Sequence, residues 1–289
     1  MSEKDKKLKI GIVGCGAIGS SLAKAIVSDF SEKAELVSLY DIDIEKAYNL
    51  SMALAIGSQT MVSRPIKFNK KLAALNLEDL INKVDLVIEA TKADTAFDIA
   101  KKAIFNSRDI MIMSVGGIIQ HYKELKVLTE EKRARVFIPS GAICGIDGLK
   151  AATCGKINKV ILTTKKPPKA FLGAPYLLKK KIRLDNIDKD TVLFEGDASQ
   201  ATKAFPQNIN VAATLSMAGI GPEATIVRIV ASPTITRNIH EIEIESDAGK
   251  IIIRCENVVH PDNLKTSYLA VLSAIATLKQ VLEPIKIGT

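Results

Sequence analysis

The sequence predicts an α/β protein with two domains, the first built on a doubly wound parallel sheet and the second of α+β type. Apolar runs typical of buried strands alternate with helical stretches through residues 8–140, and this alternation favours parallel strands joined by crossover helices. After Ser140 the sequence becomes rich in glycine and then shows more polar strands. A chain of 289 residues with 47% hydrophobic content is long enough for two cores. We therefore place a domain boundary near residue 140.

A glycine-rich loop joins the first expected strand to the first expected helix. The apolar run KLKIGIV leads into Gly14-x-Gly16-x-x-Gly19, and the helical stretch SSLAKAIVSDF follows. Gly14 permits a tight turn, Gly16 lets the backbone approach a pyrophosphate, and Gly19 lets the helix pack close to its strand. The free N–H groups at the helix start favour an anion. The loop, with Ala17 and Ile18 inside it, therefore predicts a dinucleotide site.

The second apolar run, AELVSLY, ends at Asp41. This residue follows the last loop glycine by about 20 positions, where a carboxylate can hold the ribose hydroxyls. Its charge would repel the 2′-phosphate of NADP, and residues 42–45 include no Arg that would reverse the sign. We therefore expect NAD as the cofactor, with NADP still acceptable because Lys46 lies near. The alternative is that Asp41 or Asp43 caps the following helix, IEKAYNLSMALA.

The same alternation continues to the end of the first domain. We expect strands at 84–90, 109–115 and 134–140, and helices at 95–104 and 123–133. In the second domain, KVILTTKK and TVLFEG are expected to be strands.

The segment 205–221, FPQNINVAATLSMAGIG, predicts a helix that stops at Gly219. Asn208 and Asn210 would lie at its positive start. One of them can serve as the cap, which leaves the other for a carboxamide or a substrate.

The segment 237–257 reads as two strands around a turn at 247–249. Glutamates alternate with isoleucines in the first strand, so His240 shares the face of Ile242 and points inward. A single histidine on an apolar face is more often a core residue than a catalytic one, and the pattern alone leaves both interpretations open.

The segment 260–285 has an apolar stripe at helical spacing and predicts a final helix. Lys265, Thr266 and Ser267 would fall in its first turn, where the helix dipole disfavours a cation unless an anion is bound there. They are therefore candidates for holding a substrate carboxylate. The alternative is that Lys265 extends into solvent.

Composition limits the class of protein. The net charge of +8 would suit a nucleic-acid partner contacted by lysines 165–166 and the run 179–183. We expect no such partner, because aromatic residues are 4% of the chain and base stacking needs them. A positive field suits an enzyme with anionic ligands equally well. No apolar run reaches the ~18 residues of a membrane span, so we expect no membrane segment.

The four cysteines lack CxxC spacing, which argues against a zinc site or a disulfide framework and favours a reducing cytoplasm. Cys15 and Cys144 lie in glycine-rich loops. We expect them to be small buried thiols, with a functional role as the alternative.

Several blocks occur in an order that resembles one family. These are GxGxIG, IPSGAICGIDGL, FPQNINVAATLSMAGIG, NIHEI, and EN followed by NLKTS and an apolar helix. Together they resemble L-aspartate dehydrogenase over nearly the whole chain. The resemblance implies a Rossmann domain, a second α+β domain with the catalytic site and the contact of a homodimer, and a last helix that returns to the first domain. The domains would be 1–140 together with 263–289, and 141–262.

The resemblance also implies roles for single residues. His240 would be catalytic, and Ala142 and Asn210 would contact the nicotinamide cofactor. The candidates for binding substrate are Asn208, Asn238, Lys265, Thr266 and Ser267. The family's Asn-Pro-Lys-Thr-Ser reads NLKTS here, so Leu264 removes a preset backbone angle from that corner.

The implied reaction oxidises L-aspartate to iminoaspartate, which water converts to oxaloacetate and ammonia, and the iminoaspartate would feed NAD synthesis. A neutral imidazole can take a proton from the amine or from the attacking water. Two alternatives remain. One is another two-domain oxidoreductase, similar to dihydrodipicolinate reductase or homoserine dehydrogenase. The other is a sensor that binds NADH without turnover.

Overall fold

The computed structural model describes residues 6–61, 72–206, 209–261 and 263–289, and the chain divides into two compact units. The first unit consists of Met1–Gly117, Lys123–Pro139 and Ala274–Ile285. The second consists of Ile118–Tyr122, Ser140–Ser273 and Lys286–Thr289. Apart from Ile118–Tyr122, the chain leaves the first unit at Pro139 and returns to it at Ala274, within the last helix.

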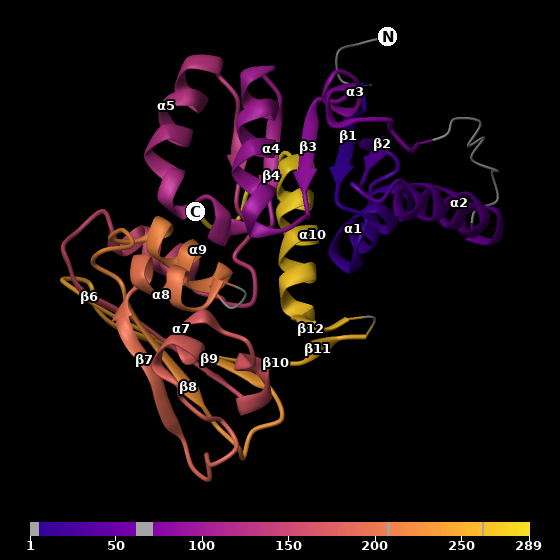
Figure 1. Cartoon of the computed structure of the whole chain (residues 1–289). Helices are drawn as coiled ribbons and strands as arrows, with labels where there is room; N and C mark the ends of the chain where they lie inside the picture. The colour runs from indigo at the N-terminus through magenta and orange to yellow at the C-terminus, as the bar shows by residue number, and fades with distance from the viewer. Residues whose placement is uncertain (1–5, 62–71, 207–208, 262) are drawn as a thin grey trace. The chain divides into compact units, whose positions relative to one another are not determined.

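The first unit contains a five-stranded sheet in the order β2-β1-β3-β4-β5, and every neighbouring pair is parallel (Figure 1). Its strands are β1 (Leu8–Val13), β2 (Ala34–Tyr40), β3 (Leu86–Glu89), β4 (Asp109–Ile112) and β5 (Val136–Phe137). The order reverses between β1 and β3, and in such sheets ligands bind outside the carboxyl ends of the strands at that point. The predicted doubly wound sheet is confirmed.

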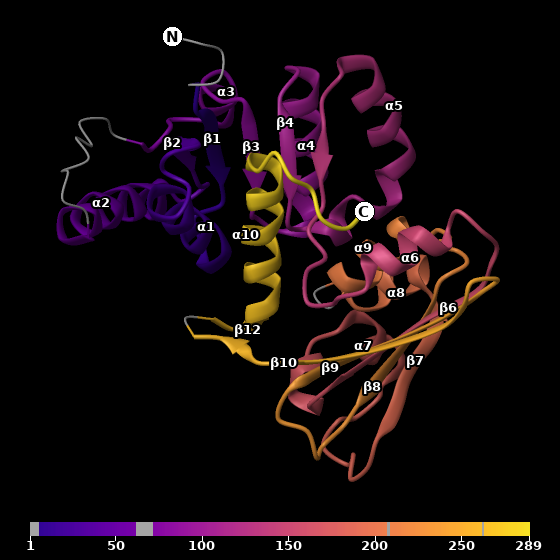
Figure 2. The same ribbon diagram turned by 180° about the vertical axis from the view of Figure 1, so that it is seen from behind.

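The helices of this unit connect the parallel strands. They are α1 (Ala17–Ser28), α2 (Ile44–Met61), α3 (Leu77–Ile81), α4 (Ala93–Phe105) and α5 (Tyr122–Lys132), with a 3₁₀ turn at Val115–Gly117. A second 3₁₀ turn, Ile119–His121, belongs to the second unit. The last helix, α10 (Tyr268–Leu282), lies beside this sheet in opposite views (Figures 1 and 2). Its Ala274 and Leu278 are fully buried in the same apolar cluster as Ile10 and Ile12 of β1. Burial of this stripe therefore ties the C-terminal helix to the first unit.

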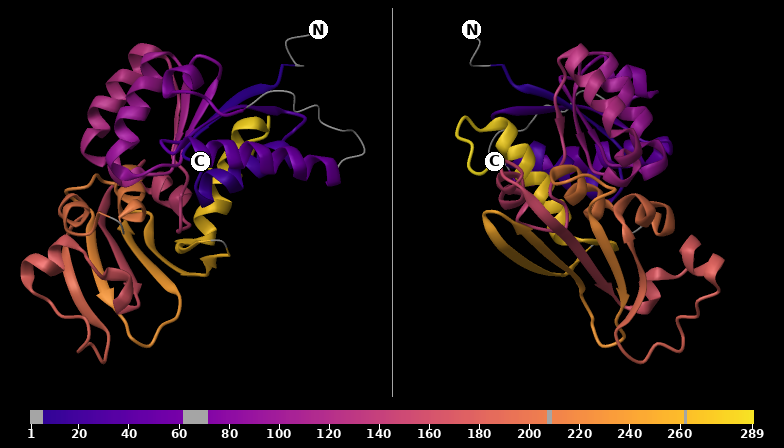
Figure 3. Two further views of the ribbon diagram at one scale, coloured as in Figure 1. Left: turned by 45° about the vertical axis from the view of Figure 1, so that its right-hand side comes forward. Right: turned by 90° about the vertical axis from the view of Figure 1, so that its left-hand side faces the viewer.

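The second unit is built on a mixed sheet in the order β10-β9-β6-β8-β7. Its strands are β6 (Ile157–Lys166), β7 (Thr191–Asp197), β8 (Ile226–Ala231), β9 (Asn238–Ser246) and β10 (Gly249–Asn257), which form one twisted layer in the views of Figure 3. Only β6 and β8 pair in parallel. The predicted hairpin at 237–257 is confirmed as β9 and β10.

One face of this sheet is apolar and the other is charged. Along β9, Ile242 and Ile244 are buried, whereas Glu241, Glu243 and Glu245 are half-buried. The unit's helices are α6 (Ile146–Ala152), α7 (Pro175–Lys180), α8 (Ala198–Ala204) and α9 (Asn210–Ala218), with a 3₁₀ turn at Pro168–Phe171.

An aromatic cluster joins these helices to the sheet. Phe205, directly after α8, packs edge-on against Phe194 of β7 with ring centroids 5.9 Å apart, and Tyr176 of α7 packs on Phe194 at 5.4 Å. Such pairs add to the free energy of burial. The helices α7 and α8 therefore cover the face of the sheet on which Phe194 lies.

The segment before α10 differs from the prediction. Residues Asn263–Ser267 form strand β12, which pairs with β11 (Val259–His260) in a separate two-stranded sheet, and the helix begins only at Tyr268. Lys265, Thr266 and Ser267 therefore lie on a strand and not in a helical first turn. Across the described ranges, no helix combines the length and apolar character that a membrane crossing requires.

Candidate active site

The glycine loop has the geometry that a pyrophosphate requires. A Cβ on Gly19 would lie 1.9 Å from the carbonyl oxygen of Gly14, so only glycine lets α1 pack this close to β1. Gly14 has a φ of +99°. At Gly16 an added Cβ would meet no heavy atom within 4 Å. As N-cap of α1, Gly16 also supplies no side chain to the first N–H groups of the helix. The loop thus offers open space and unsatisfied donors to an anion, so its residues fit a dinucleotide.

Asp41 follows β2 and faces this loop. Its Oδ2 accepts the backbone N–H of Cys15 at 2.8 Å, and its Oδ1 accepts the N–H of Asp43 at 3.0 Å. These bonds fix the carboxylate beside the loop, and ionised carboxylates have further lone pairs for ribose hydroxyls. Asp43 contacts Lys46 at 3.5 Å.

A buried carboxylate that the sequence analysis missed holds the edge of the same sheet. Glu89 ends β3 and is fully buried. Its Oε1 accepts the N–H and the hydroxyl of Thr91 at 2.6 and 2.7 Å, and its Oε2 accepts the N–H of Ser114 at 2.9 Å. Glu89 therefore ties together the segments that follow β3 and β4.

The thiol of Cys15, inside the loop, is buried, as expected. Burial and, to a smaller extent, the nearby Asp41 carboxylate together raise its pKa to about 12. A thiol that stays protonated is a poor nucleophile.

In the second unit, His240 lies on the buried face of the sheet, near the start of β9, with 3% of its surface exposed. The inward orientation predicted from the alternation of β9 is confirmed. A row of side chains crosses the sheet at its level, and strand register brings together Phe194, Ile229, Thr164, His240 and Cys255.

Thr164 anchors the imidazole. Its Oγ1 lies 3.0 Å from His240 Nδ1, and both side chains are buried. When Nδ1 carries the proton and donates a hydrogen bond to Thr164 Oγ1, Nε2 keeps its lone pair and can accept a proton from a ligand.

The surroundings of His240 keep it neutral. Burial and, to a smaller extent, the positive charge of Lys166 together lower its pKa to about 3. Lys166 is itself half-buried at the end of β6, and burial lowers its pKa to about 8. The imidazole is therefore a proton acceptor, and a bound anion would raise its pKa towards neutrality.

The loop 141–145 lies against the end of β10. Asn257 Nδ2 donates to the carbonyl oxygen of Ala142 at 2.9 Å, and the N–H of Gly141 donates to Ser273 Oγ at 3.1 Å. Asn257 pairs with Asn238 across β9 and β10, two residues along the strands from the pair of Cys255 with His240. Ala142, Asn238 and His240 thus belong to one region of the second unit.

Cys144 in this loop is exposed, so the prediction of a buried thiol is wrong at this position. The Sγ atoms of Cys144 and Cys255 are 3.2 Å apart. Partial desolvation of the Cys144 thiol and its contact with Cys255 raise the pKa of Cys144 to about 11. The two residues are 111 positions apart in sequence, so spacing could not reveal the pair.

The other predicted site residues lie on α9, on β12 or outside the described residues. Asn210 is the exposed first residue of α9, where Ile209 occupies the N-cap position and makes no side-chain capping bond. Asn208 lies outside the described residues. Thr266 is half-buried and Ser267 buried on β12, which belongs to a different sheet from His240. Lys265 is on the same strand. In the described ranges, no group of three or more His, Cys, Asp or Glu could hold a metal ion.

Each half of the chain matches the model of a known protein family. Residues 14–139 match the family model described as homoserine dehydrogenase, NAD binding domain, and residues 147–281 match the model described as aspartate dehydrogenase, C-terminal. The first match indicates a shared nucleotide-binding fold, whereas the second distinguishes the chain from homoserine dehydrogenases in the half that contains His240.

Full-length relatives agree with the second match. The L-aspartate dehydrogenase of Methanosarcina mazei is 44% identical over 286 residues, which cover 98% of this chain and 100% of that protein. That of Methanosarcina acetivorans is 45% identical with the same coverage. The crystal structure of aspartate dehydrogenase from Thermotoga maritima aligns with a TM-score of 0.72 and 25% identity over 98% of this chain and all of that one.

Proposed function

The chain belongs to the L-aspartate dehydrogenase family, and from this premise we propose that it catalyses the oxidative deamination of L-aspartate with a pyridine nucleotide. The products are iminoaspartate and then, after hydrolysis, oxaloacetate and ammonia. The observation that carries the proposal is the buried His240, anchored by Thr164, in the unit that matches the aspartate dehydrogenase model.

The first unit binds the cofactor in this proposal. The pyrophosphate would be held by the loop residues Gly14, Gly16, Ala17, Ile18 and Gly19, and the uncapped start of α1 would stabilise its charge. The Asp41 carboxylate would accept hydrogen bonds from the hydroxyls of the adenosine ribose, which favours NAD over NADP. A bound nicotinamide would supply the acceptor for the hydride that leaves the substrate's Cα.

The second unit handles the substrate and its protons. His240 takes a proton at Nε2 from the substrate amine, which must be neutral before hydride can leave, or later from the attacking water. The fixed Nδ1 contact with Thr164 keeps the ring in one orientation. Ala142 and Asn210 are proposed to contact the nicotinamide, and Asn208, Asn238, Lys265, Thr266 and Ser267 the substrate.

We further propose a homodimer that works in the cytoplasm and supplies iminoaspartate for pyridine nucleotide synthesis. The support for these points is the family relationship alone. Light scattering of the purified chain tests the dimer, since a monomer mass at micromolar concentration would exclude it.

The decisive experiment measures formation of reduced nicotinamide by absorbance, with a panel of amino acids and with NAD and NADP in turn. We expect turnover with L-aspartate and none with homoserine. Oxidation of homoserine would indicate the related oxidoreductase class. Tight NADH binding without turnover of any amino acid would indicate a sensor and overturn the proposal.

A further inference from the structure

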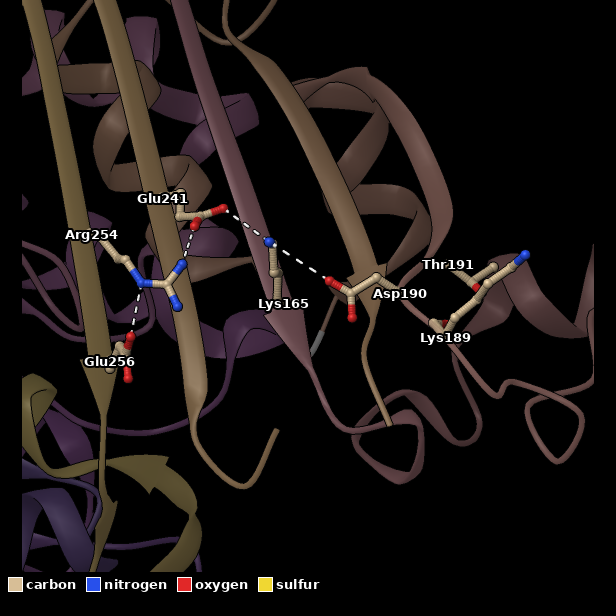
Figure 4. Close-up of polar contacts among 7 residues, drawn as sticks. All are labelled: Lys165, Lys189, Asp190, Thr191, Glu241, Arg254 and Glu256. Atoms are coloured by element: carbon tan, nitrogen blue, oxygen red, sulfur yellow. Dashed lines mark hydrogen bonds and ion pairs between the residues drawn. The ribbon is translucent and has the colours of Figure 1, made fainter. Parts of the chain in front are cut away.

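The side chains of β10 alternate between the two faces of the second sheet. Arg254 and Glu256 lie on the charged face, where Figure 4 shows the Arg254 guanidinium bonded to the carboxylates of Glu241 and Glu256. The residue between them, Cys255, therefore points to the opposite face. Strand register places Cys255 directly opposite His240, so this thiol and the imidazole are neighbours on the buried face of the sheet.

The loop 141–145 runs along the same face of β10. The carbonyl oxygen of Ala142 accepts a hydrogen bond from Asn257 Nδ2 at 2.9 Å. Two residues further along the loop, Cys144 meets Cys255 with the Sγ atoms 3.2 Å apart. Residue numbers rise along the loop and fall along β10, so the loop lies antiparallel to the strand.

Gly145 holds the other side of this contact. It has a φ of +78°, and an added Cβ would lie 2.1 Å from Cδ1 of Ile253, the next residue of β10 on this face. Contacts at Ala142 and at Gly145 thus hold the thiol of Cys144 over Cys255 from both sides.

The two thiols differ in their access to solvent. Cys144 is exposed, whereas Cys255 is buried with 8% of its surface exposed. An oxidant in solution therefore meets Cys144 first, and Cys255 lies within reach of the oxidised product. A pair of this kind supplies both the thiol that reacts with the oxidant and the thiol that resolves it.

We propose that Cys144 and Cys255 form a redox modification site, at which a peroxide joins the two thiols in a disulfide that lowers turnover at His240. The inference rests on the proposed function for the turnover, and on the contact between the thiols for the modification itself.

The modification consumes one molecule of hydrogen peroxide. The Cys144 thiolate attacks one peroxide oxygen, the O–O bond breaks, and hydroxide leaves a sulfenic acid behind. The Cys255 thiolate then attacks Cys144 Sγ, so that the S–S bond forms while the S–O bond breaks and a second hydroxide leaves. The protons of the two thiols convert both hydroxides into water. The sulfur pair thereby loses two electrons, which reduce the peroxide.

The disulfide would displace groups that belong to the proposed site. Bonded sulfurs are about 2.05 Å apart, so the two Sγ atoms must approach each other by about 1 Å. The loop that carries Ala142, the proposed nicotinamide contact, and the strand beside His240 would share this movement. A misplacement of about 1 Å can cost on the order of 10²-fold in rate.

The test compares turnover before and after oxidation. The parent is treated with hydrogen peroxide in mild alkali, which converts more of the Cys144 thiol to thiolate, and is assayed with aspartate after the peroxide is removed. We expect kcat to fall by about tenfold or more. Dithiothreitol should restore it, because this dithiol reduces the disulfide to two thiols and is itself oxidised to a disulfide.

Cys154→Ser is the matched control. Cys154 is exposed as well, but its Sγ contacts the carbonyl oxygen of Lys150 at 4.0 Å. This variant should lose turnover on oxidation as the parent does. Cys144→Ser and Cys144→Ala should each keep the turnover of their own untreated samples. An equal loss in the two Cys144 variants would place the sensitive group elsewhere and overturn the proposal.

A second readout does not depend on aspartate. The chain has three histidines, so NMR of labelled imidazoles can follow His240 directly. Oxidation should shift the His240 signals in the parent and in Cys154→Ser, and leave them unchanged in Cys144→Ser.

The outcomes are distinct. If the parent oxidises no aspartate but a Cys144–Cys255 disulfide forms and shifts the His240 signals, the proposed function fails and the modification site stands. If no such disulfide forms, or if it changes neither turnover nor the His240 signals, the inference is wrong.

Discussion

Thr164 Oγ1 and His240 Nδ1 lie 3.0 Å apart on neighbouring antiparallel strands, at positions that are directly paired in register. The contact fixes the ring and favours one tautomer of the imidazole. The tautomer matters for the chemistry, because Nε2 can act as a base only when the proton is on Nδ1.

We expect His240→Asn to lower kcat for aspartate by a factor on the order of 10² to 10⁴, the usual contribution of positioned proton transfer. Cofactor affinity should stay the same. Thr164→Val should also lower kcat, whereas Thr164→Ser should retain most activity because it keeps the hydroxyl. A folded His240→Asn protein with near-parental turnover would show that His240 is only a core residue.

The low pKa of His240 predicts how stability depends on pH. The unfolded chain binds a proton at this residue below its ordinary pKa of 6.5, whereas the folded chain binds it only near about 3. Stability should therefore fall as pH drops through this window, and at pH 5 the contribution is about 2 kcal/mol. Urea unfolding of the parent and of His240→Asn at pH 5 and 7.5 tests this. The parent should lose more stability than the variant, and equal losses would contradict the burial argument.

Asp41 is expected to determine cofactor preference. Asp41→Ser should shrink the ratio of kcat/KM for NAD to that for NADP by about tenfold, because a repulsive charge near the 2′-phosphate is removed. Asp41→Asn is the matched control, since it keeps an acceptor for the Cys15 N–H and loses the charge. An unchanged ratio in both variants would show that Asp41 does not meet the ribose.

Two glycines of the loop should fail in different ways when replaced by alanine. Gly19→Ala would place a Cβ 1.9 Å from the Gly14 carbonyl oxygen and should lower the free energy of unfolding by about 1–3 kcal/mol. Gly16→Ala meets no protein atom and keeps a common φ of −77°. It should leave unfolding unchanged and weaken NAD binding, as calorimetry would measure. Full NAD affinity in a folded Gly16→Ala protein would exclude the proposed pyrophosphate position.

The thiols of Cys144 and Cys255 are close enough for a disulfide after a small movement, since a bonded pair is about 2.05 Å apart. We expect hydrogen peroxide to oxidise them to one disulfide with release of water, faster at higher pH because the raised pKa keeps Cys144 protonated. Mass spectrometry should find a loss of two hydrogens in the parent and none in Cys255→Ser. Oxidation that links Cys154 instead would contradict the expected pairing.

The parts of this protein that sequence predicts well are those with local causes. The glycine loop needs only a strand, a turn and a helix in succession, and the inward position of His240 follows from strand alternation. The strand at Asn263–Ser267 was missed although its partner, Val259–His260, is nearly adjacent in sequence, because the apolar stripe of α10 extends over Leu264 at helical spacing.

Other features depend on contacts between distant segments. A dipeptide of two lysines does not show which one faces a buried histidine, and only the register of β6 with β9 separates Lys165 from Lys166. Glu89 gave no signal either, because an acidic residue at the end of an apolar strand is usually exposed.

The buried carboxylate of Glu89 affects the entropy cost of binding a ligand where the strand order of the first sheet reverses, between β1 and β3. Its bonds to Thr91 and Ser114 arrange the segments after β3 and β4 as soon as the chain folds. The entropy of ordering these segments is therefore lost during folding and not at association. This edge of the sheet is therefore preorganised. A nucleotide that binds there loses mainly the freedom of its own torsions.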